Sequence, residues 1–352
     1  MVHSSKSPKI DVVIPAYNAA KFIADTIQSV LRQTLSPHKI IIVDDGSTDN
    51  TLEIVQNFNS ELIEVISVSN GGVSCARNIG IKASQSDYIA FLDADDFWEQ
   101  DKLKAQIEEL FANPNARAVY SYAIMCDEKG QYTKNAHAYN NTPYQSGSLP
   151  EKLLFEFVNL SGSASSVMVE TKLLKSTTLF DETMTFAEDI DLWFRIASLT
   201  EFILVPKEHV KIRVNTSSST RKLSWSAKKK MISDHFYFMH KYAKDYQIPR
   251  ATIDISLSYL TRSFVKRPHR IMEFFYFHKH LRNRAPDYFR QISNHDTAIR
   301  FFFRTITVII MHPYRRIRLI GRLKLLFTEG TIFFSKSKNY SLNTTIPVKK
   351  RR

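Results

Sequence analysis

The sequence is poor in cysteine, glycine and proline. Its 352 residues include 2 Cys, 9 Gly and 12 Pro. Two cysteines provide neither a framework of disulfide bonds nor the ligand spacing of a zinc site. The low glycine and proline content excludes collagen-like and low-complexity chains. We therefore expect an ordinary globular protein from a reducing compartment.

Long hydrophobic runs are also missing. The N-terminal residues lack the apolar core of a signal peptide, since the first apolar run covers only residues 12–15. No uncharged apolar stretch reaches the roughly 18 residues that a bilayer-spanning helix needs. The best candidate, residues 305–311, is short and lies between arginines. These absences predict a cytoplasmic protein without a spanning helix.

Positive charge is unevenly distributed along the chain. The net charge is +13, yet residues 221–352 hold 29 Lys and Arg against 7 Asp and Glu, so residues 1–220 are acidic overall. Such asymmetry is typical of contact with a polyanion, either a membrane surface or a nucleic acid.

Strand-like and helix-like patterns alternate in the first hundred residues. Apolar runs predict strands at residues 11–15, 39–43, 62–68 and 88–92, and apolar residues at helical spacing predict helices at residues 19–33, 51–58 and 73–83. This βα alternation predicts a mostly parallel sheet with helices on both faces. Further strands are predicted at residues 118–125, 167–169, 202–205 and 210–214, and further helices at residues 103–111 and 189–197.

The polar stretch at residues 217–220 predicts a domain boundary. We expect an α/β domain at residues 1–220, with ligand-binding residues 9–100 and an acceptor and catalytic part at residues 101–220. A basic helical region at residues 221–352 would follow.

Polar clusters occur where the first four predicted strands end. They are Tyr17-Asn18, Asp44-Asp45, Asn70-Gly71-Gly72 and Asp93-Ala94-Asp95-Asp96. Ligands of open parallel sheets bind beyond the carboxyl ends of the strands, so these clusters predict a binding site.

The acidic turn after the fourth strand is a candidate metal site. Two carboxylates on a short turn, such as Asp93 and Asp95, are hard oxygen ligands for Mg²⁺ or Mn²⁺. A divalent cation can neutralise the charge of a departing diphosphate. A solvated acidic turn at a helix start is the alternative interpretation.

Three other positions are candidate ligand contacts, and two of them also have an ordinary interpretation. Asp45 can accept a hydrogen bond from the N–H of a pyrimidine imide, or can simply form a turn and cap a helix. Tyr17 can stack on a nucleotide base. Arg77, on a helix that follows two glycines, can contact a phosphate or form a surface salt bridge.

Acidic residues also mark the predicted helix at residues 189–197. Glu188, Asp189 and Asp191 lie at a loop-to-helix junction. Crowded carboxylates can have a raised pKa and serve as a general base. Acids that complement the helix dipole are the alternative.

Taken in order, five segments resemble the inverting glycosyltransferases of family 2, which have the GT-A fold. The segments are VVIPAYN (12–18), IIVDDGSTD (41–49), GGVSCARNIG (71–80), YIAFLDADD (88–96) and AEDIDLWFRIA (187–197). The resemblance covers about residues 9–220 and implies a GT-A, Rossmann-like, mostly parallel sheet with flanking helices.

The resemblance also implies roles for individual residues. Pro15, Tyr17 and Asp45 would contact the nucleotide base, and Arg77 would lie near the phosphates. Asp93 and Asp95 form the D-x-D motif and would bind Mn²⁺ or Mg²⁺, with Asp95 as the direct ligand and Asp93 also close to the donor.

On the acceptor side, the same resemblance makes Asp189 the catalytic base, supported by Glu188. One position departs from the family pattern. Many relatives have Arg-x-His after the last strand, whereas this chain has Arg213-Val214-Asn215. Asn215 is a candidate third metal ligand through its side-chain carbonyl oxygen, and a site without this ligand is the alternative.

The C-terminal region mixes cations with aromatic residues. On a helical wheel Arg315, Arg318 and Arg322 share one face. This is typical of a helix at an anionic membrane surface, although an ordinary core helix with a basic face has the same pattern. A nucleic-acid interface is disfavoured because the acidic first part would repel the polymer.

The resemblance thus implies transfer of a sugar, with inversion, from a nucleotide-diphospho sugar to a glycan or lipid-linked hydroxyl. UDP is the expected nucleotide because it prevails in the family, and cell-surface polysaccharide synthesis at the inner face of the plasma membrane is the expected setting. A sugar-nucleotide pyrophosphorylase is one alternative, although the glycine-rich basic loop that it needs is missing after the first strand. A non-catalytic membrane scaffold is the other.

Overall fold

The computed structural model describes residues 7–133, 160–214, 234, 237–238 and 241–242. The chain divides into two units between His235 and Phe236, and the sheet and helices named below belong to the first unit. The predicted boundary at residues 217–220 and nearly all of the predicted basic region, residues 221–352, lie outside the described residues.

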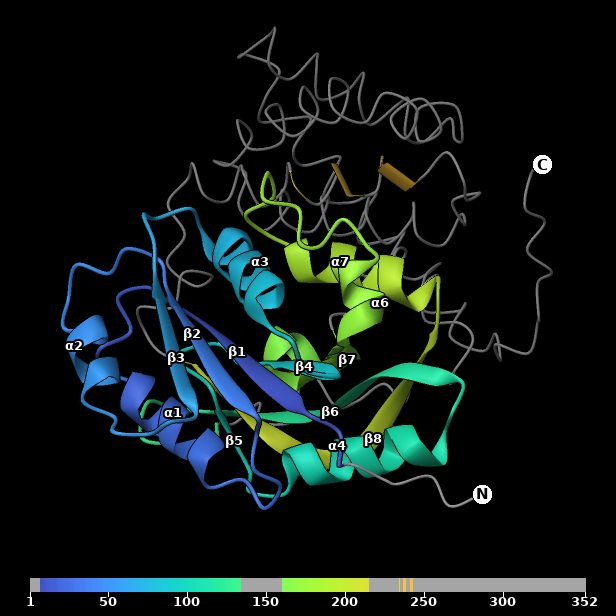
Figure 1. The fold of residues 1–352 in the computed structure, drawn as a ribbon, viewed down its shortest axis with the longest axis horizontal. Helices are drawn as coiled ribbons and strands as arrows, with labels where there is room; N and C mark the ends of the chain where they lie inside the picture. The colour runs from blue at the N-terminus through green and yellow to red at the C-terminus, as the bar shows by residue number, and fades with distance from the viewer. Residues whose placement is uncertain (1–6, 134–159, 215–233, 235–236, 239–240, 243–352) are drawn as a thin grey trace, which may run out of the picture. The chain divides into compact units, whose positions relative to one another are not determined.

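One sheet of eight strands forms the centre of the described part (Figure 1). The strands are β1 (Ile10–Ala16), β2 (Lys39–Asp44), β3 (Ile63–Ser67), β4 (Tyr88–Phe91), β5 (Phe97–Trp98), β6 (Ala116–Cys126), β7 (Val167–Glu170) and β8 (Glu201–Arg213). Their order across the sheet is β3-β2-β1-β4-β7-β6-β8-β5. The sheet is buried on both faces at β1, which agrees with the continuous apolar runs of its sequence.

The direction of the strands changes in the middle of the sheet. β3, β2, β1 and β4 run parallel to one another, whereas β7 is antiparallel to both β4 and β6. β8 is again parallel to β6, and the short β5 pairs antiparallel to β8. The predicted mostly parallel sheet is therefore confirmed, with β7 and β5 reversed.

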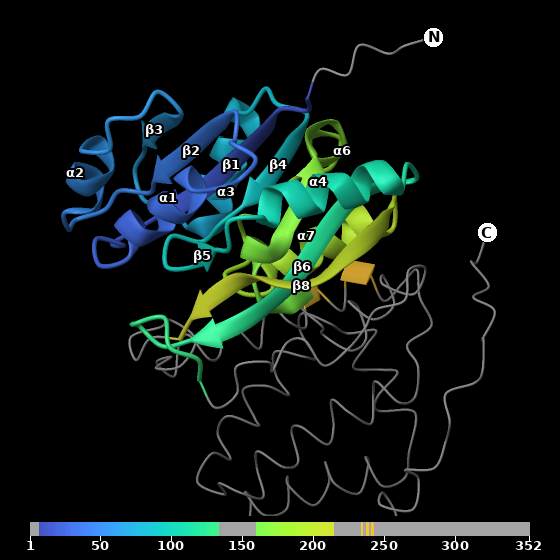
Figure 2. The same cartoon turned by 90° about the horizontal axis from the view of Figure 1, so that it is seen from below.

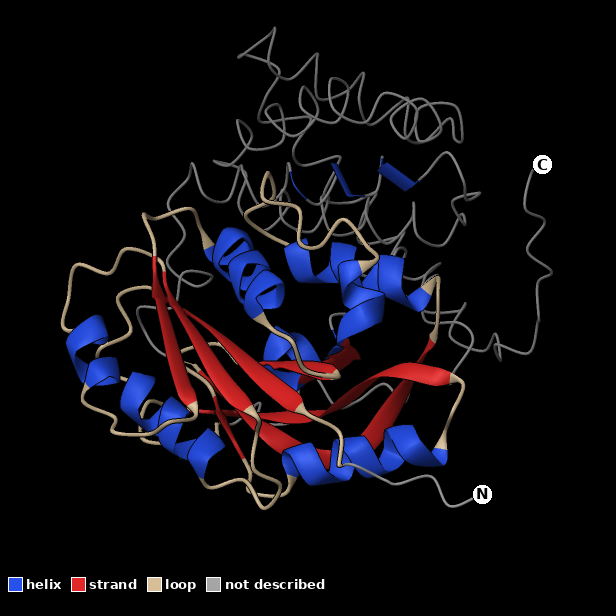
Figure 3. Ribbon diagram, in the orientation of Figure 1, coloured by secondary structure: helices blue, strands red, loops and turns tan. Residues whose placement is uncertain are grey.

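Helices cover both faces of the sheet (Figure 3). They are α1 (Ile23–Leu31), α2 (Thr51–Gln56), α3 (Val73–Ala83), α4 (Lys102–Ala112), α6 (Thr171–Lys175) and α7 (Glu188–Ala197), with short 3-10 turns η1 (Leu160–Gly162) and η2 (Ala164–Ser166). α3, α6 and α7 lie on one side and α1 and α4 on the other (Figure 1). No helix within the described ranges is long and apolar enough to cross a bilayer.

The two segments predicted as strands at residues 202–205 and 210–214 form a single strand, β8. It runs beside β6 over the length of both (Figure 2). Ser121 pairs with Val205 and Tyr122 with Glu208, so Pro206 falls in an irregularity of the register. Proline cannot donate to a strand ladder and is tolerated at such a bulge, which is why it interrupts the sequence pattern but not the strand.

Close packing fixes α3 against β1. A Cβ atom at Gly80 would lie 2.5 Å from Cγ1 of Val13, so any larger residue here would push the helix off the strand. On the same side, the rings of Phe91, Phe180 and Trp193 pack with centroids 5.6–6.0 Å apart. This aromatic cluster joins β4 to α7 beneath the candidate site.

Candidate functional site

The polar clusters meet at the edge of the sheet where β1, β2, β3 and β4 end. Because these strands are parallel, their carboxyl ends lie together. Tyr17 follows β1, Asp45 follows β2, and the Asp93–Asp96 turn follows β4. The edge predicted as a binding site therefore gathers the residues that the sequence pattern singled out.

The loops after β1 and β2 are joined by side-chain hydrogen bonds. Asn18, at a left-handed φ of 49°, accepts the N–H groups of Thr48 and Asp49 on its Oδ1 at 2.8 and 3.3 Å. Its own N–H donates to Oγ of Ser47 at 3.0 Å. Asn tolerates this backbone conformation better than most residues. The connection fixes the backbone next to Tyr17, a residue that is 51% exposed.

Asp45 holds the glycine loop that precedes α3. Its two carboxylate oxygens accept the N–H groups of Gly71 and Gly72 at 2.7 and 2.9 Å, and the residue is buried. Each carboxylate oxygen has a second lone pair. Asp45 therefore has the ordinary role of a turn-forming acid. Its carboxylate oxygens can still accept a hydrogen bond from a further donor.

Pro15 is buried within β1 and pairs in register with Val43 of β2. The carbonyl of Val13 accepts the N–H of Leu92, so the backbone groups of Val13 face β4. Pro15, two residues later on β1, faces the same side, and its missing N–H falls beyond Val13 and Phe91, the last residue pair between β1 and β4. A central strand can therefore contain proline at this point without losing a ladder bond.

Arg77 joins the two acidic motifs. Its Nη2 donates to Oδ1 of Asp93 at 2.7 Å and its Nη1 donates to Oε1 of Glu188 at 3.0 Å. The guanidinium is buried and lies 5.1 Å from the ring centroid of Phe180. Burial by itself would lower the pKa of Arg77, but the charges of Asp93 and Glu188 outweigh it and raise the pKa. A surface salt bridge, the ordinary alternative for Arg77, does not describe this position.

Two serines order the acidic turn after β4. Oγ of Ser163 lies 3.1 Å from Oδ2 of Asp93 and 3.1 Å from Oδ2 of Asp96. Oγ of Ser165 donates to Oδ2 of Asp96 at 2.7 Å and accepts the N–H of Asp93 at 3.0 Å. Since one hydroxyl hydrogen serves one acceptor, Asp93 and Asp96 compete for the Ser163 hydroxyl. Burial, followed by the charges of Asp95 and Asp93, raises the pKa of Asp96 well above its usual range.

Asp95 differs from its neighbours, because no side chain in the described ranges donates to its carboxylate. Burial and then the charge of Asp93 raise the pKa of Asp95 to about 6. A half-buried carboxylate without a side-chain donor, beside two other acids, has the chemistry of a cation ligand. No group of three His, Cys, Asp or Glu within the described ranges is arranged as a complete metal cage. Mg²⁺ is usually bound by one or two carboxylates plus substrate phosphates, so the residues present fit such an ion.

Glu188 and Asp189 begin α7. Glu188 is buried, and burial, followed by the charge of Asp189, raises its pKa to about 7 despite the opposing effect of Arg77. Oδ1 of Asp189 accepts the N–H of Ile190 at 2.8 Å. The next acid, Asp191, pairs with Arg195 one turn later at 2.7 Å. Glu188 and Asp93 are thus brought to the same guanidinium from positions 95 residues apart in the sequence.

Arg213 anchors the acidic turn from the end of β8. Its N–H donates to Oδ1 of Asp96 at 3.2 Å, and its Nη2 pairs with Oδ2 of Asp25 at 2.8 Å. Asn215, the candidate third ligand, lies outside the described residues. The contacts of Ser163, Ser165 and Arg213 with the acidic turn were not predicted. For the two serines, the run of small polar residues just before the buried strand at residue 167 was an available signal, and Arg213 belongs to the segment compared above with Arg-x-His.

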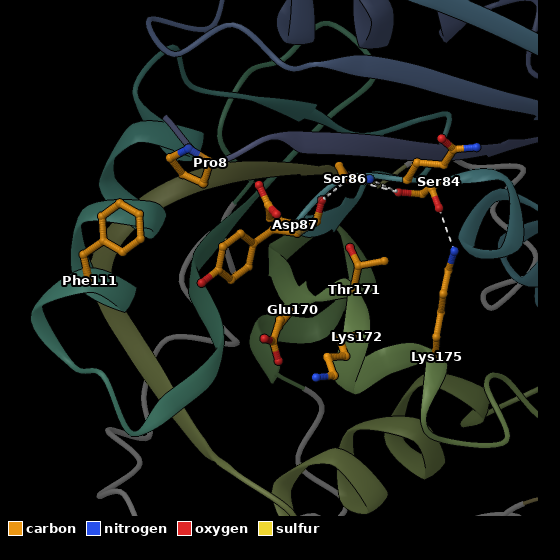
Figure 4. Close-up of a pocket in the computed structure, with 11 residues that line it drawn as sticks. Pro8, Ser84, Ser86, Asp87, Phe111, Glu170, Thr171, Lys172 and Lys175 are labelled. Carbon is orange, nitrogen blue, oxygen red and sulfur yellow. Dashed lines mark hydrogen bonds between the residues drawn. The ribbon is translucent and has the colours of Figure 1, made fainter. Parts of the chain in front are cut away.

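An open pocket of about 620 Å³ lies away from this edge, near the starts of β1 and β4 (Figure 4). Ser84, Asp87, Phe111, Glu170 and Lys175 are among its lining residues. None of the predicted site residues lines it, so the carboxyl edge remains the candidate site.

Comparison with known proteins finds similarity to one family. Residues 11–166 match glycosyl transferase family 2. An uncharacterized glycosyltransferase of Rickettsia felis is 32% identical over 213 residues, which is 60% of this chain and 34% of that protein. The putative teichuronic acid biosynthesis glycosyltransferase TuaG of Bacillus subtilis is 38% identical over 140 residues, 39% of this chain and 56% of that protein. The chain thus spans about a third to about half of the length of these two relatives.

Solved structures show the same fold. The crystal structure of S. aureus TarS 1-349 in complex with UDP superposes with a TM-score of 0.57 at 18% identity, covering 86% of this chain and 91% of that one. TarS 1-349 in complex with UDP-GlcNAc gives a TM-score of 0.55, also at 18% identity, over 81% and 83% of the two chains. This likeness confirms the predicted GT-A fold class. Residues 11–166 of this chain thus match glycosyl transferase family 2, the family that its sequence motifs resemble.

Proposed function

We propose that this chain transfers a sugar, with inversion, from a nucleotide-diphospho sugar to a hydroxyl group. The observation that carries the proposal is the bridge formed by Arg77 between Asp93 of the D-x-D turn and Glu188 of the helix α7 start. The bridge supports the proposal because Asp93 lies two residues from Asp95, the candidate cation ligand, and Glu188 directly precedes Asp189, the candidate base.

The donor would bind across the ends of β1 and β2. The exposed ring of Tyr17 is available to stack on the base, and Asp45 and Pro15 would also contact the base. UDP is our first choice of nucleotide because TarS, which shares the fold, is solved with UDP and with UDP-GlcNAc. Arg77 would lie near the diphosphate and keep Asp93 in place.

A divalent cation, Mn²⁺ or Mg²⁺, would be held by Asp95, with Asp93 beside it, and would neutralise the leaving diphosphate. Ser163 and Ser165 orient the turn that contains both acids. Asn215 would be a third ligand.

Asp189 would act as general base. The acceptor oxygen attacks C1 of the sugar, the bond from C1 to the diphosphate oxygen breaks, and the hydroxyl proton passes to the Asp189 carboxylate. Attack opposite the leaving group inverts the anomeric carbon. Glu188, held by Arg77, would support the orientation of its neighbour.

The acceptor would be a glycan or a lipid-linked hydroxyl in cell-surface polysaccharide synthesis. The name of the Bacillus relative, a putative teichuronic acid glycosyltransferase, supports this setting. The basic residues 221–352 would attach the enzyme peripherally to the inner face of the plasma membrane. Recovery of the full chain entirely in the supernatant of a low-salt, detergent-free cell lysate would contradict this attachment.

The experiment that tests the transfer is a donor screen. Purified protein is incubated with a panel of UDP-, dTDP- and GDP-sugars, with Mn²⁺ or with EDTA, and released nucleoside diphosphate is measured. We expect release from one UDP-sugar, dependent on the cation and lost in Asp95→Asn. Absence of release from every donor, with and without glycan acceptors, would contradict the proposal.

A further inference from the structure

The start of α7 has no cap of its own. Ala187 precedes the helix with φ 60° and ψ 18°, a left-handed conformation that a residue with a Cβ adopts at a cost, and no side chain caps the helix there. Glu188 and Asp189 follow directly. Some other part of the molecule must therefore hold this turn if the two acids are to have a fixed orientation.

Asp234 provides that restraint. Its Oδ2 accepts the N–H groups of Thr185 and Phe186 at 2.8 and 3.3 Å, and the residue is 1% exposed. Both donors belong to the peptide groups just before Ala187. Buried N–H groups rarely stay unpaired, and a carboxylate is a strong acceptor for two of them at once.

We propose that Asp234 is a positioning residue for the acidic motif at the start of α7. It would hold the backbone of Thr185 and Phe186, and thereby the left-handed turn at Ala187, so that Glu188 and Asp189 keep one orientation. Its effect on transfer rests on the proposed function, whereas the anchoring itself does not.

Asp234 lies far along the sequence from the other residues of the site. It lies beyond the residues that match the family, 11–166, and beyond the predicted boundary at residues 217–220. The catalytic unit therefore extends at least to residue 234, which agrees with the division of the chain after His235.

Residue-resolved hydrogen–deuterium exchange of the full chain tests the anchor. In the wild type the amides of Thr185 and Phe186 should be protected. Asp234→Ala should speed their exchange about 10-fold or more, since their acceptor is removed. Asp234→Asn keeps an acceptor oxygen and should leave them protected.

The matched control is Asp181→Ala. Asp181 accepts the N–H of Thr183 at 3.0 Å in the same connection, so its loss should affect Thr183 but not the two amides beyond it. Unprotected wild-type amides would overturn the anchor, even if Asp234→Ala fails to fold. Equal protection in the wild type and Asp234→Ala would overturn it as well.

Kinetics test the positioning role. Asp234→Ala should lower kcat about 10-fold or more, because a small displacement of the base is costly, and should change the donor KM little. Asp234→Asn should restore kcat. Loss of protection without loss of kcat would overturn the role in catalysis. A wild type inactive with every donor would contradict the proposed function, while the exchange data would still decide the anchor.

Discussion

Nη2 of Arg77 lies 2.7 Å from Oδ1 of Asp93. Arg77 lies on α3, which follows β3, whereas Asp93 lies on the turn that follows β4. The same guanidinium donates to Glu188, so one buried cation contacts two acids. Without Arg77, the negative charges of these two acids would repel each other. Removing one partner of a buried, charged network leaves the others without compensation. Arg77 therefore supports both the fold and the site.

Replacing Arg77 by Lys should be costly. Lysine keeps the charge but lacks the planar fork that addresses two carboxylates at once. We expect Arg77→Lys to lower the free energy of unfolding by about 3 kcal/mol, as for a broken buried pair. Urea unfolding measures this change. Arg117→Lys is the matched control, because Arg117 pairs with Glu170 at a more exposed site and should lose under about 1 kcal/mol. Equal losses in the two variants would contradict the role given to Arg77.

Replacing Ser163 by Ala should weaken cation binding. The hydroxyl lies between Asp93 and Asp96, and its loss frees the acidic turn to change shape. Since partners that orient metal ligands commonly contribute 10-fold or more to affinity, we expect the Kd for Mn²⁺ with donor present to rise about 10-fold. Electron paramagnetic resonance of free Mn²⁺ measures it. Ser198→Ala, which removes a hydroxyl bonded to a backbone carbonyl at the end of α7, should leave the Kd unchanged. An unaltered Kd in Ser163→Ala would refute the prediction.

Replacing Gly80 by Ala should destabilise the protein through α3. The new Cβ would lie 2.5 Å from Cγ1 of Val13, so the helix that contains Arg77 must shift. Overpacking of this kind costs about 1–3 kcal/mol. The double variant Gly80→Ala with Val13→Ala removes the clashing atoms and should be less destabilised than the sum of the single variants. Strict additivity in thermal or urea unfolding would show that the two residues do not press on each other.

Ionisation of Glu188 should make the cation-free protein less stable as the pH rises. Its pKa in the folded state is raised from 4.5 to about 7, so the folded chain binds the proton more tightly than the unfolded chain. The protonated form of Glu188 therefore contributes to the free energy of unfolding. This contribution is fully present below pH 4.5 and is lost as the pH rises through 7. Glu188→Gln does not titrate, so between about pH 5 and 8 it should gain up to about 3 kcal/mol relative to the wild type. The free energy of unfolding of the wild type and of Glu188→Gln is measured against pH in EDTA. Two parallel curves would contradict the raised pKa of Glu188.

The sequence predicted the parallel half of the sheet well because its strands are buried on both faces. Such strands appear as continuous apolar runs, and residues 39–43 were predicted within one residue of the observed Lys39–Asp44. The candidate site at the carboxyl edge followed from the same pattern, since Asp45 and the Asp93–Asp95 motif come directly after strands.

What the sequence could not predict depends on contacts between distant residues. Lys102 would be expected in solvent at the start of a helix, yet it is fully buried, 4.0 Å from the ring of Trp98 and 2.7 Å from Oε1 of Gln106. Burial lowers its pKa well below the usual range. The partners of Arg77 likewise come from separate elements, and no local pattern indicates them.

The most direct test of the account compares donor binding with turnover in Asp189→Asn. Calorimetric titration with the donor found in the screen, in the presence of Mn²⁺, should give a Kd within about 3-fold of the wild type, since the base contributes to the chemical step and not to donor binding. Nucleotide release with acceptor should fall by at least about 100-fold, the usual contribution of a general base. Release at the wild-type rate, or loss of donor binding, would contradict the assignment of Asp189 as the base of an inverting glycosyltransferase.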